Sequence, residues 1–244
     1  MRKIFVDLHL RLNLKDQAAT SRMITKAASL GYRLIAASLP PEISKNEIAQ
    51  LKAICSEVKV DFASRVDLRP KTPNELLRSL RRLRRKFEVI CVNCENKQVA
   101  RQAAKDRRVD LLNFSSLDLR KRFFDTAEAE LASSSLAALE IDVRPLLVLE
   151  GASRIRLLSS LRREVAVAME FHVPIVVSSG VSEEKLLRKP REMAALAFLF
   201  GLDETTGLKA VVDEPAAIVK RNREKLSSRF VAEGIRIIKK GEDC

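Results

Sequence analysis

Short apolar runs alternate with longer segments of helical periodicity along the whole chain. The runs are five to seven residues long and rich in Val, Ile, Leu and Phe, which is typical of buried strands. Seven of them predict strands: Ile4–Leu8, Arg33–Ser38, Val60–Val66, Glu88–Asn93, Asp110–Phe114, Ala138–Val143 and Val173–Ser178. Strands that alternate with helices form βα units, whose strands lie parallel in one sheet.

Seven near-equal units in an undivided chain of 244 residues favour closure into an α/β barrel of the TIM-barrel type. No GxGxxG pattern follows the first run, which argues against a dinucleotide-binding fold. The eighth unit is irregular, because Leu208–Asp213 fits either a strand or a short helix, and Arg229–Ile238 fits an added edge strand. We therefore expect a single (β/α) barrel domain over residues 1–244, with a basic C-terminal tail at 226–244.

The segment Pro73–Lys86 shows how one of these helices is specified. Thr72 precedes Pro73 and Glu75, the arrangement of an N-cap, a first-turn proline and a capping box. Apolar residues at helical spacing predict its buried face: Leu76, Leu80, Leu83 and Phe87. A second face carries an arginine stripe: Arg78, Arg81, Arg82 and Arg85. Like charges at this spacing repel one another, so the stripe favours binding to a polyanion over a merely solvated face.

Charge supports the same interpretation. Lys and Arg outnumber Asp and Glu by 45 to 32, and residues 65–122 alone hold 17 basic and seven acidic side chains. A positive field of this size attracts polyanions, nucleic acid first. Aromatic residues make up only 5% of the chain, with no Trp, so stacking platforms for single strands are scarce. We expect paired or folded RNA, held by charge and shape.

The composition also limits the compartment. No apolar run approaches the roughly 20 residues of a membrane span, and residues 1–13 are too charged for a signal peptide. We expect a cytoplasmic protein with no membrane partner. Cys91 and Cys94 form a CxxC pair, but no second pair completes a zinc site, so a structural role is favoured.

Asp7 and His9 lie at the carboxyl end of the first predicted strand, where barrel enzymes place their active sites. A catalytic metal site needs several converging His and carboxylate ligands. The chain has one other histidine, His172, which precedes its strand and therefore lies at the opposite end of the barrel. Three carboxylates remain as oxygen ligands for a weak site: Asp67, Glu95 and Asp142. We expect no metal or other cofactor, and hydrogen-bonding roles for Asp7 and His9.

A second candidate site follows the seventh run, where Ser178, Ser179 and Gly180 form a candidate phosphate or anion loop. In barrel enzymes the loops after the late strands hold substrate phosphate, and Ser182 would cap the next helix with its N–H groups open to an anion. A turn and a helix cap explain the same residues. No His lies near this loop in the sequence, so we expect no serine nucleophile and no catalytic residue here.

Several short elements occur in a characteristic order along the chain. They are FVDLHL near the N-terminus, VDLLNF at 109–114, ALEIDVRPLL at 138–147, VPIVVSSG, RKPRE, AALAFLFG at Ala194–Gly201 and PAAIVKRN at Pro215–Asn222. Together they resemble the RNase P protein component 3 family, the archaeal counterparts of the 30-kDa RNase P/MRP subunit. The similarity covers nearly the whole chain, but the arginine stripe and the tail RIIKKGEDC depart from the family pattern.

The resemblance implies a barrel similar to that of the polymerase-and-histidinol-phosphatase (PHP) metal hydrolases, with Asp7 and His9 as remnants of a degraded ligand set. It implies a subunit of ribonuclease P, the endoribonuclease that removes 5′ leaders from precursor tRNA with a catalytic centre in its RNA. The implied partners are RNase P RNA, which the protein would bind and stabilise, RNase P protein component 2, other protein subunits and, indirectly, precursor tRNA.

Two enzyme hypotheses stay open beside the subunit hypothesis. One is a metal-dependent phosphoesterase of the PHP type on the same barrel, which requires a tightly bound metal. The other is a barrel enzyme that uses the loop Ser178–Gly180 for a small phosphorylated substrate. Neither hypothesis accounts for the strongly basic segment 65–122.

Charge and position together select the residues expected to contact RNA. They follow predicted strands, flank Pro190 or form the arginine stripe: Arg65, Arg69, Arg78, Arg81, Arg82, Arg85, Arg101, Arg120, Lys121, Arg144, Arg188 and Arg191. Arg122, which follows Lys121, is expected to contact RNA as well. If several of these side chains converge at one mouth, the barrel presents a basic rim.

Overall fold

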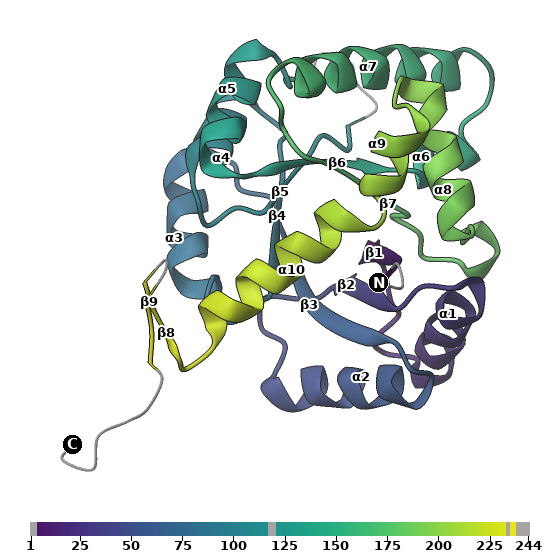
Figure 1. The fold of residues 1–244 in the computed structure, drawn as a ribbon, viewed down its shortest axis with the longest axis vertical. Coiled ribbons are helices and arrows are strands. Elements are labelled where there is room, and N and C mark those ends of the chain that lie inside the picture. The colour runs from purple at the N-terminus through teal and green to yellow at the C-terminus, as the bar shows by residue number, and fades with distance from the viewer. Residues whose placement is uncertain (1–3, 117–120, 233–234, 238–244) are drawn as a thin grey trace.

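Seven parallel strands form one sheet in chain order in the computed structural model, which describes residues 4–116, 121–232 and 235–237 (Figure 1). The strands are β1 Val6–Leu10, β2 Leu34–Ser38, β3 Asp61–Leu68, β4 Val89–Asn93, β5 Leu111–Asn113, β6 Ala138–Asp142 and β7 Ile175–Ser178. Every predicted strand is present, with bounds that differ by at most two residues. The TIM-barrel-like α/β fold is confirmed.

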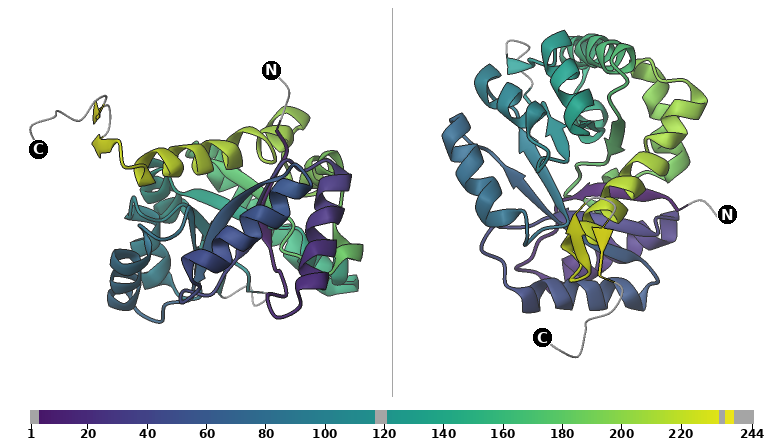
Figure 2. Two further views of the ribbon diagram at one scale, coloured as in Figure 1. Left: turned by 90° about the horizontal axis from the view of Figure 1, so that it is seen from below. Right: turned by 60° about the vertical axis from the view of Figure 1, so that its left-hand side comes forward.

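Helices surround the strands on the outside of the barrel (Figure 2). They are α1 Gln17–Leu30, α2 Lys45–Glu57, α3 Pro73–Leu83, α4 Lys97–Lys105, α5 Thr126–Ser135, α6 Arg144–Val148, α7 Gly151–Glu170, α8 Pro190–Leu196, α9 Glu204–Lys209 and α10 Asp213–Leu226, with 3₁₀ turns η2 Glu184–Leu186 and η3 Ala197–Phe200. Within the described part of the chain, no helix has the length and apolar character to cross a membrane.

Helix α3 begins as its sequence predicts. The hydroxyl of Thr72 accepts a 3.2 Å hydrogen bond from the N–H of Glu75, and Pro73 occupies the first helical position. The Glu75 carboxylate accepts from the N–H of Lys71 at 2.8 Å, one residue earlier than in a standard capping box. The predicted apolar face is buried: Leu76, Leu80, Leu83 and Phe87.

An irregular segment takes the place of an eighth strand. Ala210 and Val211, between α9 and α10, lie between β7 and β1. The carbonyl of Ala210 accepts a 3.0 Å hydrogen bond from the N–H of Val177, and the carbonyl of Val211 accepts one of 3.0 Å from the N–H of Val6. At the carboxyl end, β1 bridges directly to the loop after β7. The carbonyls of Ala210 and Val211 and one bridge therefore join the first and last strands. The segment Leu208–Asp213 is not a strand.

Helix α10 lies across the amino end of the barrel (Figures 1 and 2). Its residues Ile218 and Val219 pack against the small apolar side chains inside the barrel. The side-chain amide of Asn222 donates to the carbonyl of Glu88 at 2.7 Å and to the carboxylate of Asp110 at 2.8 Å. Apolar packing and buried hydrogen bonds thus seal this end.

The C-terminal residues do not add an edge strand to the barrel, which corrects that prediction. Phe230–Ala232 (β8) and Ile235–Arg236 (β9) pair antiparallel with each other in a separate two-stranded sheet. This hairpin follows α10 and lies at the end of that helix (Figure 1). The barrel edges are already joined through Ala210 and Val211, so they offer no free ladder to the tail.

Replacing Ile218 with Ala should lower the free energy of unfolding by about 2–4 kcal/mol, because it leaves a cavity between α10 and the barrel interior. Urea unfolding followed by circular dichroism measures this loss. Lys220→Ala, on the exposed side of the same helix, is the matched control and should cost less than about 0.5 kcal/mol. Equal losses in the two variants would show that α10 does not plug the barrel.

Candidate functional site

Polar side chains fill the carboxyl end of the barrel interior, above the apolar layer that α10 seals. Residues two apart on a strand face the same side, so several strands each contribute to this layer. Its members are His9 of β1, Arg65 and Asp67 of β3, Asn113 of β5, Glu140 and Asp142 of β6 and Ser178 of β7.

Arg65 is the centre of this layer and is fully buried. Its two terminal nitrogens donate to the two carboxylate oxygens of Glu140 at 2.5 and 2.7 Å, and its Nε donates to Asp67 at 2.7 Å. Burial opposes ionisation of Glu140, but the Arg65 guanidinium outweighs it and lowers the pKa of Glu140 to about 2. A fourth hydrogen bond, of 2.8 Å, reaches the carbonyl of Leu8. All three groups are therefore charged, and Arg65 holds both carboxylates through hydrogen bonds.

The burial of Arg65 corrects the prediction that it contacts RNA, because no phosphate reaches a side chain with 0% exposure. Arg122 is corrected in the same way. It is 8% exposed and forms a two-point ion pair with Glu164, at 2.7 and 2.5 Å. Both arginines hold the fold together instead of facing solvent.

His9 enters the barrel through an irregularity in β1, whose register with β2 shifts between Asp7 and Leu10. Its Nδ1 lies 2.8 Å from Asp142 and its Nε2 lies 3.3 Å from Asp67. Burial and the nearby Arg65 guanidinium oppose the charged form, but the two carboxylates outweigh them and raise the pKa of His9 to about 10. The ring is therefore a buried imidazolium at neutral pH.

Asp7 does not join His9 in the barrel. Its Oδ1 accepts hydrogen bonds from the backbone N–H of His9 at 3.1 Å and from that of Ser179 at 3.0 Å. Burial raises the pKa of the Asp7 carboxyl group. The two residues of the DLH motif thus have separate hydrogen-bonding roles.

Three side chains lie close enough to share a metal ion: His9, Glu140 and Asp142, whose ligand atoms are within 4.8 Å of one another. They do not fit one, because Arg65 occupies both oxygens of Glu140 and His9 carries a positive charge. A divalent cation would have to displace a guanidinium from the fully buried layer. The exposed side chain of Glu95 takes no part in this group.

The loop after β7 lacks the open N–H groups that an anion cradle needs. The N–H of Ser179 donates to Asp7, and the N–H of Gly180 donates to the carbonyl of His9 at 2.9 Å. The hydroxyl of Ser178 donates to Glu140 at 2.8 Å. Gly180 has φ +65°, and a side chain there would lie 2.7 Å from the carboxyl carbon of Asp142. The loop therefore closes the barrel, which corrects its assignment as a phosphate site.

The CxxC pair has no common environment. Cys91 faces the barrel interior, where its thiol lies 3.5 Å from Glu140, and Cys94 lies in the outer apolar core with its thiol 3.5 Å from the carbonyl of Val92. Burial raises the pKa of both thiols. A structural role, as expected from the sequence, follows from this separation.

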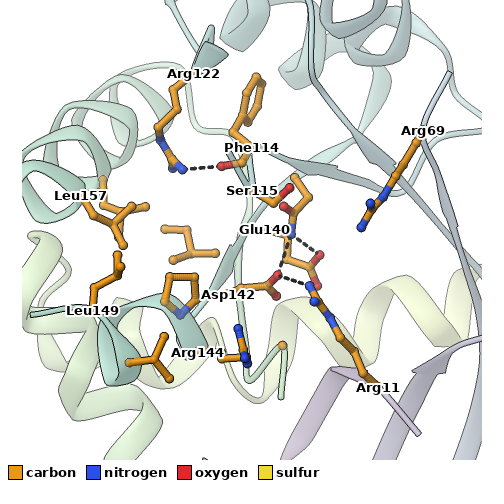
Figure 3. A pocket seen from close by; sticks show the side chains of 16 residues that line it. Arg11, Arg69, Phe114, Ser115, Arg122, Glu140, Asp142, Arg144, Leu149 and Leu157 are labelled. Carbon is orange, nitrogen blue, oxygen red and sulfur yellow. Dashed lines mark hydrogen bonds and ion pairs between the residues drawn. The ribbon is translucent and has the colours of Figure 1, made fainter. Parts of the chain in front are cut away.

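A cavity of about 250 Å³ opens above the polar layer at the carboxyl mouth (Figure 3). Arg11, Arg69 and Arg144 line it together with Asp142. Leu149, which follows α6, and Leu157 of α7 lie across from Arg11 and Arg69. Val148 and Leu161 also line the cavity and add to this apolar wall. The mouth thus combines three cationic side chains with an apolar surface.

The other residues predicted to contact RNA do not converge on this mouth. The stripe is exposed, with Arg78, Arg81 and Arg82 on α3 and Arg85 in the turn that follows it, because α3 ends at Leu83 and not at the predicted Lys86. Arg188 and Arg191 lie at the start of α8, the first partly buried and the second exposed. Lys121 is exposed, and Arg120 lies outside the described residues. Of the residues predicted to contact RNA, Arg69 and Arg144 therefore meet at the mouth, and the others described occupy separate faces.

Arg101 of α4 is bound within the protein. Its guanidinium lies 3.6 Å from Asp125 and 3.2 Å from the buried Glu128. Burial and a hydrogen bond with Asp125 raise the pKa of Glu128 to about 7. Because these carboxylates neutralise part of its charge, Arg101 attracts RNA less strongly than the residues of the α3 stripe.

Two basic groups were missed by the sequence reasoning. Arg11, which follows β1 directly, could have been selected by the same rule as Arg69. The second group lines a cavity of about 630 Å³ beside the β8–β9 hairpin, where Arg84, Arg107, Arg108 and Lys225 join the predicted Arg85. In the sequence these basic residues lie at the ends of α3, α4 and α10. They come together in space because of the course of α10.

Comparison with known proteins shows what the chain resembles. The model of the family described as RNase P subunit p30 matches residues 4–227. Ribonuclease P protein component 3 of Methanosarcina barkeri is 32% identical over 177 residues, 72% of this chain and 73% of the relative. The same component of Methanothermobacter thermautotrophicus is 26% identical over 96% of this chain and 95% of its own. A chain in the cryo-EM structure of archaeal ribonuclease P with mature tRNA has the same fold, with a TM-score of 0.85, 22% identity and coverage of 98% and 100%.

Replacing Arg65 with Met should cost roughly 3–5 kcal/mol of unfolding free energy, since it leaves the buried Glu140 without its cation and Asp67 with His9 as its remaining cationic partner. The double variant Arg65→Met, Glu140→Met should recover part of this loss, because both charges of the closest pair are gone. Denaturant unfolding of the two single variants and the double variant measures the coupling. Strictly additive losses would contradict a direct Arg65–Glu140 interaction.

The pKa of His9 also predicts a pH dependence of stability. Its raised folded-state pKa means that its contribution is complete below pH 6.5 and is lost as the pH rises towards 10. The contribution should be roughly 3–5 kcal/mol at pH 6. The difference in unfolding free energy between the wild type and His9→Gln, measured from pH 6 to pH 10, isolates it from other titrating groups. A difference that stays constant over this range would show that His9 is neutral in the folded protein.

Proposed function

This chain belongs to the RNase P subunit p30 family, and we propose from that premise that it binds and stabilises the catalytic RNA of ribonuclease P, the endoribonuclease that removes 5′ leaders from precursor tRNA. The subunit role follows from the family. The proposal adds the mode of action: direct contact with the RNA through fixed basic faces, with the catalytic centre in the RNA. We place the protein in the cytoplasm, as one barrel domain over residues 1–244.

The observation that carries this proposal is the arginine stripe of α3. All four side chains are exposed: Arg78, Arg81, Arg82 and Arg85. Within the described part of the chain none of the four forms an ion pair, and Arg78 alone has a hydrogen bond, of 3.4 Å, to the carbonyl of Asn74. Unpaired arginines on one rigid helix neutralise backbone phosphates and release the counterions condensed on RNA.

The barrel interior supports a subunit without its own catalytic centre. A general acid or base must reach a substrate, but Glu140 and Asp67 are held by Arg65, and His9 is charged and enclosed by Asp142 and Asp67. The rival metal-dependent phosphoesterase would need these same carboxylates as ligands. The partners in this proposal are RNase P RNA, protein component 2, the other protein subunits and, indirectly, precursor tRNA.

Changing all four stripe arginines to Gln should weaken binding to RNase P RNA and lower the slope of log affinity against log salt by about 2–4, because each lost phosphate contact removes roughly 0.7–0.9 from it. Filter binding between about 50 and 200 mM salt measures both quantities. Cleavage of precursor tRNA by the complex reconstituted from RNA and protein subunits should lose stimulation in parallel.

The matched control removes the same charge from α1, α2 and the segments beside them, away from the stripe. Lys15, Lys26, Lys45 and Lys59 are exposed on or beside α1 and α2, and their change to Gln should leave the salt slope within one unit of the wild type. An equal loss in both variants would show attraction by net charge without a defined face. Cleavage by the isolated chain with Mn²⁺, abolished in His9→Ala, would instead establish the phosphoesterase.

A further inference from the structure

The cavity at the carboxyl mouth has two walls of opposite character. On one side Leu149 and Leu157 present apolar surface (Figure 3). Val148, which also lines the cavity, is 44% exposed. On the other side lie the guanidinium groups of Arg11 and Arg69, with Arg144 between the two walls. A ligand that fills this space must therefore offer an apolar body and an anionic group at once.

Each of the three arginines can still donate hydrogen bonds to a ligand. Arg69 is exposed and has no hydrogen bond or ion pair with any described residue. The Nε of Arg144 is buried and also lacks a partner among those residues. Arg11 lies 3.8 Å from Asp142, at the long limit of an ion pair, and its Nε lies 3.3 Å from the Nε2 of His9, so its terminal nitrogens face the cavity with one weak partner. A buried N–H without an acceptor costs about 1–3 kcal/mol, which a ligand oxygen would recover.

The floor of the cavity does not repel an anion as its carboxylates suggest. Glu140 is held at both oxygens by Arg65, and Asp142 is hydrogen-bonded to His9 at 2.8 Å and to the amide of Asn113 at 3.2 Å. The remaining charged lining residue, Arg122, is paired with Glu164. Three carboxylates face two cations, Arg65 and His9, in this layer, so one negative charge remains. The three arginines of the rim outweigh it and determine the sign of the charge that the mouth attracts.

We propose that this cavity binds one unpaired nucleotide, with its phosphate between Arg11, Arg69 and Arg144 and its base against the apolar wall of α6 and α7. A bare phosphate leaves the apolar wall exposed, and an uncharged apolar molecule leaves the guanidinium groups unpaired. A nucleotide satisfies both, because every base has an apolar face and guanidinium groups pair with phosphate at two points. A volume of about 250 Å³ is below the roughly 300–1,000 Å³ of drug-binding pockets, and it admits a base and not a duplex.

The nucleotide has two sources, an unpaired residue of the RNA or a free mononucleotide. The RNA source rests on the proposed function, whereas the pocket chemistry does not. The first arm of the test therefore uses the full isolated chain and measures binding of AMP, adenosine and inorganic phosphate by equilibrium dialysis. AMP should bind at least about tenfold more tightly than either fragment, since only AMP reaches both walls.

Variants separate the two walls. Arg144→Met and Arg69→Met should each weaken AMP binding about tenfold or more and leave adenosine binding unchanged. Val148→Asp should weaken AMP and adenosine together. Arg163→Met, an exposed arginine on α7 outside the cavity, is the matched control and should bind AMP like the wild type. Equal binding of AMP and phosphate, or AMP binding unaffected by Arg144→Met, would overturn the proposal.

The second arm identifies the source of the nucleotide. A photo-crosslinking amino acid in place of Val148 is used in the complex reconstituted with RNase P RNA. A crosslink to one unpaired RNA position assigns the pocket to the RNA, and AMP binding without a crosslink assigns it to a free nucleotide. Absence of both overturns the pocket while the salt slope of the α3 stripe variant still reports on the proposed RNA contact, so the two failures are distinguishable.

Discussion

The fold depends on one buried cation. Arg65 donates to Glu140, Asp67 and the carbonyl of Leu8, and so ties β6, β3 and β1 together across the interior of the barrel. Buried charges are tolerated only where their hydrogen bonds and their net charge are matched inside the protein. With the guanidinium in place, His9 and Asp142 complete a layer whose members all depend on one another for that match.

This layer determines which end of the barrel a ligand reaches. Beneath it the interior is apolar and α10 seals the amino end, while the carbonyls of Ala210 and Val211 take hydrogen bonds that an eighth strand would otherwise receive. An irregular closure at that end leaves the carboxyl mouth undistorted. The polar layer is therefore the floor of an open mouth, and the charges around its rim stay in contact with solvent.

Local sequence patterns predicted the strands and both faces of α3, because these follow from the periods of strand and helix and from capping by Thr72. They did not predict the burial of Arg65, since a basic residue near a strand end is usually exposed and its partner Glu140 lies 75 residues away. The engaged amide of Gly180 was missed for the same reason, because its acceptor belongs to the first strand. Interactions between distant strands carry no local signal.

A guanidinium and a divalent metal ion both pair with carboxylates, but they have different chemical consequences. A metal ion polarises a bound oxygen and ionises water, whereas a guanidinium always keeps its protons and offers only hydrogen bonds. Arg65 thus supplies the positive charge that the folded barrel needs without supplying a reactive centre. Because the internal carboxylates are matched in this way, they take no charge from the exposed arginines of α3 or from Arg69. Those side chains keep their charge for external phosphates, so matching the interior makes the basic surface available for binding.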